Sequence, residues 1–199
     1  IRDADRSRGL GDVYKRQIVY DAPTAQAIVC NSGVANACTG EEGYGYCKET
    51  AKIAAESLQI PEDSVLVAST GVIGKQLPMD LLGAGIKNLV PLLSHTREAG
   101  KLAAQSIMTT DTVSKEVAVT MEIGGKTVTL GGMCKGSGMI HPNMCTMLGF
   151  LTTDVAMSKE LLQKALSTVV KDTYNMVSVD GDTSTNDTCL LYTSDAADE

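Results

Sequence analysis

The chain has 199 residues, 43% hydrophobic and 21% charged, which is ordinary for a globular domain with one sizeable core. Its net charge of -7 leaves no surplus of Lys and Arg to neutralise phosphates, which argues against a nucleic-acid partner and favours small-molecule chemistry. No stretch approaches the roughly twenty apolar residues of a membrane span, and no secretory signal pattern is present. We therefore expect a cytoplasmic protein with no membrane partner.

Six cysteines are present, but they form no C-x-x-C pair and no histidine lies near them at metal-ligand spacing. This pattern favours reduced, mostly buried thiols over a disulfide framework or a zinc site. We expect no metal.

The two ends of the chain are predicted to be foreign sequence. Codons that can encode residues 12–17, taken as their reverse complement, encode residues 189–193, so the ends are inverted copies of one DNA element. The element resembles a transposase adapter used in sequencing libraries. Such tails should pack little against the rest, because ordering each residue costs about 1 to 2 kcal/mol of backbone entropy. The expected segments are adapter-derived tails at 1–17 and 189–199, exposed at 1–16 and 192–199, around a biological domain at 18–188.

Hydrophobic periodicity predicts two buried strands and three helices in the first half of this domain. In chain order they are a strand at 26–31, a helix at 41–58, a strand at 64–69, and helices at 78–90 and 96–107. The first strand is expected to enter a turn at Asn31-Ser32-Gly33, and the second ends at Thr70-Gly71-Val72-Ile73-Gly74.

The second half is predicted to contain three strands and a helix. In chain order they are strands at 116–123, 126–130 and 147–153 and a helix at 158–170. Gly124-Gly125 indicates a two-residue hairpin, and Gly131-Gly132 is expected to interrupt the strand that follows. Ser158 is a predicted N-cap. The mixture of elements predicts an α/β or α+β class.

Three stretches combine glycine with small hydroxyl residues at predicted strand ends, where backbone amides can approach a ligand. They are 69–74, 108–111 and 135–150. A phosphate-binding P-loop is excluded, because Gly125-Lys126-Thr127 would need its first glycine where Thr120 stands. Gly71 and Gly74 are too sparse for a dinucleotide-binding fingerprint.

Long motifs identify a resemblance to a known family. KGSGMIHPNMCTMLGFLTTD, VASTGVIG and VDGDTSTNDT resemble motifs of ornithine acetyltransferases, also called bifunctional glutamate N-acetyltransferases, and NSGVANA at 31–37 resembles another. The resemblance implies an N-terminal-nucleophile-like fold of layered sheets flanked by helices, here truncated at both ends. It also implies self-cleavage between Cys145 and Thr146, with 18–145 in the first subunit and 146–188 opening the second.

The resemblance further implies a reaction in arginine biosynthesis, in which Thr146 accepts acetyl from N-acetylornithine and passes it to glutamate. A threonine hydroxyl is a weak nucleophile, but a freed α-amine with a pKa of about 7.7 to 8.0 can serve as its base. Thr70 and Gly71 match oxyanion-hole positions; Thr109, Lys135 and Thr146 match substrate-binding positions. No cofactor is implied, apart from acetyl-CoA as an alternative donor in a bifunctional enzyme. The implied macromolecular partner is the chain's own cleaved second part, in a heterotetramer.

Two other interpretations stay open. An N-terminal-nucleophile amidohydrolase or aminopeptidase would share the self-cleavage and the oxyanion hole but deliver the acyl group to water, so acceptor dependence separates it from a transferase. A non-catalytic binding or assembly protein, or an inactive fragment, would keep the fold without being cleaved. His141 precedes a proline and is expected to be a structural loop histidine, since the family mechanism does not use it.

Overall fold

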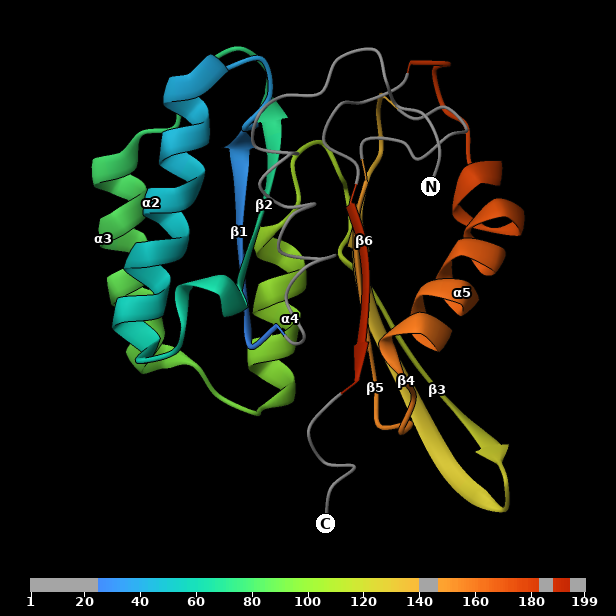
Figure 1. The fold of residues 1–199 in the computed structure, drawn as a ribbon. Coiled ribbons are helices and arrows are strands. Elements are labelled where there is room, and N and C mark those ends of the chain that lie inside the picture. Colours follow the sequence, from blue (N-terminus) through green and yellow to red (C-terminus); the bar gives the residue numbers. More distant parts are fainter. Residues whose placement is uncertain (1–24, 140–146, 183–187, 194–199) are drawn as a thin grey trace. The chain divides into compact units, whose positions relative to one another are not determined.

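The structure is a computed structural model that describes residues 25–139, 147–182 and 188–193 (Figure 1). The chain divides between Thr109 and Thr110 into two compact units. We call the described residues up to Thr109 the N-terminal unit and those from Thr110 onward the C-terminal unit. Across these described ranges, no helix is long and apolar enough to span a membrane.

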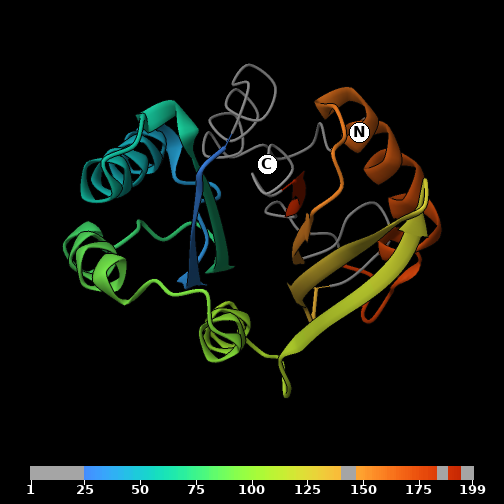
Figure 2. The same cartoon turned by 90° about the horizontal axis from the view of Figure 1, so that it is seen from below.

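The N-terminal unit is built on two parallel strands, β1 (Ala27–Val34) and β2 (Val65–Val72). Parallel strands need a long crossover, which α2 (Gly40–Leu58) and a 3-10 turn (Glu62–Ser64) supply. Helix α3 (Met79–Leu89) lies beside α2, and both are on one side of the strand pair (Figures 1 and 2). A 3-10 turn (Val90–Leu92) and α4 (Arg97–Ser106) complete the unit.

The core of this unit forms where α2 lies against β2. Small side chains recur at helical spacing along α2 and are buried, which gives the helix an apolar stripe that can approach the strands closely. Buried on α2 are Cys47, Ala51, Ala54 and Ala55; buried on β2 are all residues from Val65 to Thr70. Burial on both faces explains why β2 is a continuous apolar run.

The helices predicted for this half are confirmed to within two residues at each end. The predicted turn at Asn31-Ser32-Gly33 is wrong, because β1 continues through it to Val34 and pairs with β2 along its whole length. The Asn31 side-chain amide instead donates to the Val34 carbonyl at 2.8 Å. Strand pairing therefore outweighs the local turn preference of these residues.

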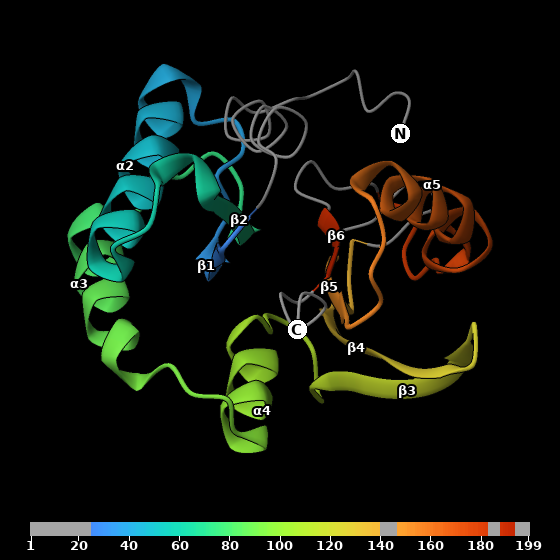
Figure 3. The same ribbon diagram turned by 60° about the horizontal axis from the view of Figure 1, so that its bottom comes forward.

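The C-terminal unit contains a four-stranded sheet in the order β3-β4-β5-β6. The first three strands are antiparallel, whereas β5 and β6 are parallel and are joined by α5 (Lys159–Val169), which lies along the sheet (Figure 3). The strands are β3 (Lys115–Ile123), β4 (Lys126–Lys135), β5 (Leu148–Thr153) and β6 (Thr188–Thr193), with 3-10 turns at Val170–Asp172 and Tyr174–Met176. This mixture confirms the predicted α/β class with helices flanking sheets.

The predicted hairpin is confirmed, with positive φ angles of 60° at Gly124 and 78° at Gly125 as its tight turn requires. The predicted interruption at Gly131-Gly132 is wrong, since β4 runs on to Lys135. A Cβ atom on Gly132 would lie 2.6 Å from Leu151 Cδ2, so this glycine makes room for a neighbouring side chain inside the sheet. Ser158 caps α5 as predicted, accepting from the Leu161 amide at 3.4 Å.

Strand β6 uses residues that were predicted to begin an adapter-derived tail. Residues 189–193 pair in register with β5, and Tyr192 is 41% exposed. Tyr and Thr side chains, which β6 contains, suit a half-buried strand, and the edge of β5 offers backbone groups for pairing. Tyr192 is therefore exposed as expected and Thr193 is half-buried, while the adapter origin of the segment stays a prediction. The rest of this tail, and the whole tail at 1–17, lie outside the described residues.

The cysteines differ from the expectation that most are buried. Of the five described, Cys47 is buried, Cys38 is exposed, and Cys30, Cys134 and Cys189 are half-buried. Burial raises the pKa of the Cys134 thiol and raises that of Cys189 to about 12. Raised pKa values keep these two thiols protonated, which makes them poor nucleophiles near neutral pH.

Candidate active site

The first candidate region is the end of β2, where the predicted oxyanion-hole residues Thr70 and Gly71 lie. Thr70 is 2% exposed, whereas Gly71 is exposed. The register places Thr70 opposite Ser32 and Gly71 opposite Gly33. The change from buried to exposed at this point brings the end of the strand out to where a ligand can reach it.

Gly71 lies unusually close to the neighbouring strand. Its φ angle is +131°, and a Cβ atom built on it would be 2.2 Å from the Gly33 carbonyl carbon and 2.4 Å from its oxygen. No side chain fits there without moving the backbone of β1, and the φ angle also disfavours other residues. The close approach of two backbones therefore dictates glycine at this position.

The segments that follow β1 and β2 are tied together. The Ala35 amide donates to the Val72 carbonyl, and the Gly74 amide donates to the Ala37 carbonyl, both at 2.9 Å. Asn36, which is 3% exposed, donates from its side chain to Cys47 Sγ at 3.3 Å and so fixes the first segment to α2. These bonds make the surroundings of Thr70 and Gly71 a constrained turn.

The predicted substrate-binding residue Thr109 is the last residue of the N-terminal unit. It is exposed in the bend after α4. Its neighbour Thr110 belongs to the C-terminal unit, where its hydroxyl hydrogen-bonds that of Ser137 at 2.7 Å. The stretch around Thr109 therefore continues directly into the C-terminal unit's site.

The second candidate region is the end of β4, where Lys135 is the last strand residue and is 2% exposed. An ordinary surface lysine would be exposed to solvent, so this burial argues against a lysine without a specific role. Lys135 pairs across the sheet with Leu148, and the described chain resumes at Met147, immediately after the predicted nucleophile. The Met147 carbonyl accepts from the Thr188 amide at 2.9 Å, so the start of β5 is held from both sides.

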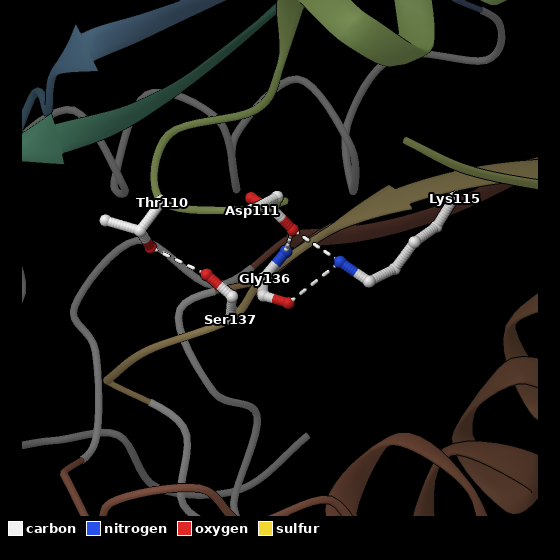
Figure 4. A network of polar contacts seen from close by, with 5 residues as sticks. All are labelled: Thr110, Asp111, Lys115, Gly136 and Ser137. Carbon is white, nitrogen blue, oxygen red and sulfur yellow. Dashed lines mark hydrogen bonds and ion pairs between the residues drawn. The ribbon is translucent and has the colours of Figure 1, made fainter. Parts of the chain in front are cut away.

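A network of charged and polar groups surrounds the residue after Lys135 (Figure 4). The Asp111 carboxylate accepts from Lys115 Nζ at 2.5 Å and, through the same oxygen, from the Gly136 amide at 2.7 Å. Lys115 Nζ also donates to the Gly136 carbonyl at 3.1 Å. The Asp111 side chain is completely buried, and that of Lys115 is 40% exposed. The carboxylate of this ion pair is buried and its ammonium is partly exposed, and together they hydrogen-bond both backbone groups of Gly136.

A second carboxylate holds the chain a few residues further on. Asp180 Oδ2 accepts from the Met139 amide at 2.5 Å, and Asp180 Oδ1 accepts from the Asp182 amide at 3.3 Å. Asp180 comes from the part of the chain that follows the predicted cleavage point, whereas Met139 precedes it. Residues on either side of that point therefore meet in one unit.

Cys145, Thr146 and His141 lie outside the described residues, so the predicted closeness of Thr146 to Gly71 stays a prediction. Thr70 and Gly71 adjoin one another in the N-terminal unit, and Lys135 belongs to the C-terminal unit. Among the described residues, no group of three His, Cys, Asp or Glu side chains could hold a metal ion.

Sequence reasoning missed the polar network. Asp111 closes the stretch 108–111 that was singled out, and Asp180 lies in the motif VDGDTSTNDT, yet neither received a role. The available signal for Lys115 was weak, because an acid and a base four residues apart suggest a pair only within a helix. Here the segment is not helical, and tertiary structure brings the two together.

The chain is similar in sequence to proteins of a known family. The sequence model of the ArgJ family matches residues 12–199. The chain is 51% identical over 176 residues to the arginine biosynthesis bifunctional protein ArgJ of Lactococcus lactis, covering 88% of this chain and 43% of that protein. The corresponding protein of Symbiobacterium thermophilum is 55% identical over 190 residues, covering 90% and 47%. The chain thus spans less than half the length of these curated relatives.

Two solved structures are similar. A crystal structure of arginine biosynthesis bifunctional protein ArgJ from Bacillus halodurans has a TM-score of 0.65 and 39% identity, covering 73% of each chain. A crystal structure of ornithine acetyltransferase complexed with ornithine from Mycobacterium tuberculosis has a TM-score of 0.60 and 31% identity, covering 71% of this chain and 74% of that one. Sequence and fold agree, and the chain belongs to the ArgJ family.

Proposed function

We propose that this chain carries part of an acetyltransferase of arginine biosynthesis that moves the acetyl group of N-acetylornithine to glutamate. The observation that carries this proposal is the 51% to 55% identity to proteins named arginine biosynthesis bifunctional protein ArgJ. The Mycobacterium tuberculosis relative binds ornithine, which supports a small-molecule substrate of the same class. Acetyl-CoA is a second acetyl donor in this proposal, and the cytoplasm is its location.

Maturation is proposed to begin at the bond between Cys145 and Thr146. The Thr146 hydroxyl attacks the Cys145 carbonyl, the C–N bond breaks, and an ester forms while the α-amine of Thr146 takes up a proton. Water then hydrolyses the ester, leaving Cys145 as a carboxylate and Thr146 as a new N-terminus. The amine released by this step can serve as the base for the hydroxyl that it adjoins.

Acetyl transfer is proposed to follow in two steps. The Thr146 oxygen attacks the acetyl carbonyl of N-acetylornithine, the amide C–N bond breaks, and ornithine leaves with a proton from the hydroxyl. The amine of glutamate then attacks the acetyl ester, which returns the threonine hydroxyl. Each tetrahedral intermediate carries an oxyanion, which the Thr70 hydroxyl and the Gly71 amide would stabilise. Lys135, a cation, would bind an amino-acid carboxylate.

The sheet of the C-terminal unit contains strands from both sides of the proposed cleavage point. Strand β4 precedes the proposed cleavage point and β5 follows it, yet the two are hydrogen-bonded from Leu130–Thr153 to Lys135–Leu148. Cleavage would therefore leave the two products joined by strand pairing and by the bond from Met139 to Asp180. This supports the proposal that the two products stay together, which the proposed heterotetramer requires.

Replacement of Thr146 tests the proposal in the full-length protein, meaning this chain extended to the length of its ArgJ relatives. Thr146→Ala should abolish both self-cleavage and acetyl transfer, because the same oxygen performs both attacks. Thr146→Ser should retain part of both, since the oxygen survives while the methyl that restricts its rotamer is lost. Mass spectrometry should find two chains and an acetylated Thr146 in the parent protein, and one intact chain in the alanine variant.

Thr168→Ala is a matched control, because the Thr168 hydroxyl is on the exposed side of α5 and donates only to the helix carbonyl of Lys164. It should leave cleavage and transfer unchanged. A Thr146→Ala protein that still splits before residue 146, or still forms N-acetylglutamate at the parent rate, rules out this nucleophile. Release of acetate without glutamate would instead indicate a hydrolase.

A further inference from the structure

The Asp111 carboxylate is the most deeply buried charge of the network at the end of β4. Its side chain has no exposed surface, and one oxygen accepts from both Lys115 and the Gly136 amide, at 2.5 Å and 2.7 Å. A carboxylate this buried is costly unless it is paired and hydrogen-bonded, and charge-assisted bonds are roughly twice as strong as neutral ones. The network therefore fixes its members firmly.

What the network fixes is the peptide backbone directly after Lys135. The amide nitrogen of Gly136 belongs to the peptide bond that joins it to Lys135, and it is held by Asp111. The carbonyl of Gly136 is held by Lys115 at 3.1 Å. Gly136 has a φ angle of +150°, a conformation that other residues rarely adopt, so this position favours glycine.

Lys135 depends on this backbone for its placement. A lysine side chain is a flexible four-carbon stem with a charge at its end, so its charge is placed accurately only when its Cα is fixed. On one side Lys135 is fixed by its pairing with Leu148, which is 1% exposed. On the other side it is fixed by the clamp on Gly136. A displaced ammonium would form a weaker charge-assisted hydrogen bond with a substrate carboxylate.

We propose that Asp111, paired with Lys115, is a positioning residue that clamps Gly136 and so holds the Lys135 ammonium where it binds the carboxylate of the acetyl donor. This inference rests on the proposed function, because it takes Lys135 as a substrate-binding residue. Asp111 itself does not touch the substrate. Its removal should weaken substrate binding more than it slows the chemical steps.

The experiment compares Asp111→Asn, Lys135→Met and the control Asp154→Asn in the full-length protein. Asp154 makes the same kind of bond at the other end of the β4–β5 pair, where its Oδ1 accepts from the Thr129 amide at 2.7 Å. Asp111→Asn should raise the KM for N-acetylornithine about tenfold, the effect of one charged hydrogen bond, with kcat changed less than about threefold. Asp154→Asn should change neither constant.

A readout that does not depend on activity accompanies the kinetics. Amide hydrogen exchange at Gly136 should become about tenfold faster in Asp111→Asn and stay unchanged in Lys135→Met and Asp154→Asn. Lys115→Met, at a partly exposed position, is the second variant in case Asp111→Asn does not fold. It removes both bonds from Lys115 and should raise KM and Gly136 exchange in the same direction.

The outcomes separate the two proposals. An unchanged KM in Asp111→Asn overturns the positioning role. The role is also overturned if Asp111→Asn and Asp154→Asn change kcat, KM and thermal stability by the same amounts. A normal KM in Lys135→Met refutes substrate binding by Lys135 and the positioning role that rests on it. A parent protein that transfers no acetyl group contradicts the proposed function, and Gly136 exchange then decides whether Asp111 clamps the strand end.

Discussion

The ends of β2 and β4 carry the two groups of predicted site residues, and they are held in different ways. At the end of β2, the backbones of Gly71 and Gly33 approach so closely that no side chain fits between them. At the end of β4, the buried Asp111 carboxylate and the partly exposed Lys115 ammonium hydrogen-bond the backbone of Gly136. Both strand ends contain a glycine with a positive φ angle. A glycine at a strand end is therefore required by a steric constraint at Gly71, whereas at Gly136 it is hydrogen-bonded by an ion pair.

This difference determines which changes each strand end tolerates. The end of β2 should be sensitive to added volume and insensitive to charge, because only backbone atoms meet there. The end of β4 should be sensitive to loss of charge, because a buried carboxylate is left without its partner. Three changes can test the comparison in turn: a substitution that adds a methyl group, a substitution that removes a hydroxyl, and a change of pH.

The largest effect is expected from Gly71→Ala. The added methyl group would lie 2.2 Å from the Gly33 carbonyl carbon, so β1 must move. Overpacking of this kind costs about 1 to 3 kcal/mol, and the φ angle of +131° adds a further cost of about 1 to 3 kcal/mol. We expect the free energy of unfolding, measured by urea titration, to fall by the sum of the overpacking cost and the conformational cost. Acetyl transfer in the full-length protein should be lost with it.

Gly33→Ala is the matched control for this prediction. Gly33 also has a positive φ angle, of +106°, but nothing lies within 4 Å of a Cβ atom built on it. Only the conformational cost of about 1 to 3 kcal/mol should therefore apply. Equal losses of stability in the two variants would show that the close approach at Gly71 contributes nothing.

A smaller effect, confined to the reaction rate, is expected from Thr70→Val. This substitution keeps the shape of a side chain that is 2% exposed and removes only its hydroxyl. If that hydroxyl stabilises the oxyanion, the barrier to acetyl transfer should rise by about 2.7 to 4 kcal/mol, as for other oxyanion-hole donors. Ser32→Ala removes the hydroxyl opposite Thr70 in the register, and its rate should stay near that of the parent. A rate of acetyl transfer in Thr70→Val equal to that of the parent would refute the assignment of Thr70 to the oxyanion hole.

Much of the fold could be predicted from the sequence, because periodicity is a local property of each element. The helix α2 and the hairpin at Gly124-Gly125 were predicted correctly for this reason. The errors lie where a neighbouring strand decides. Asn31-Ser32-Gly33 suggests a turn in isolation but pairs with β2, and Gly131-Gly132 suggests a break but makes room for Leu151.

The candidate site was predictable to the extent that a motif carried it. Thr70, Gly71 and Lys135 belong to long matching motifs, so resemblance sufficed to name them. Asp111 and Lys115 act through a pairing that depends on tertiary structure, since their segment is neither a helix nor a strand until Lys115 enters β3. Sequence spacing alone does not show which backbone amide a carboxylate will reach.

An effect on stability alone is expected from alkaline pH, through two groups of the C-terminal unit. Burial, reinforced by Cys189 and Cys134, raises the pKa of Tyr174 to about 12, and burial raises that of Cys189 to about 12. The Tyr174 hydroxyl and Cys189 Sγ both lie beside Gly149, 3.6 Å and 3.5 Å from a Cβ atom built on it. Both groups prefer the neutral form in the folded protein.

The sign of the effect follows from where each group ionises. The ordinary pKa values are 9.0 for the thiol and 10.0 for the phenol, so the unfolded chain loses these protons first as the pH rises. Their contribution to stability is fully present below pH 9 and is lost between there and pH 12. Urea titrations from pH 8 to 11 should show a falling free energy of unfolding, with a shallower fall in Tyr174→Phe, which cannot ionise. A slope in Tyr174→Phe identical to that of the parent would contradict the assignment of this effect to Tyr174.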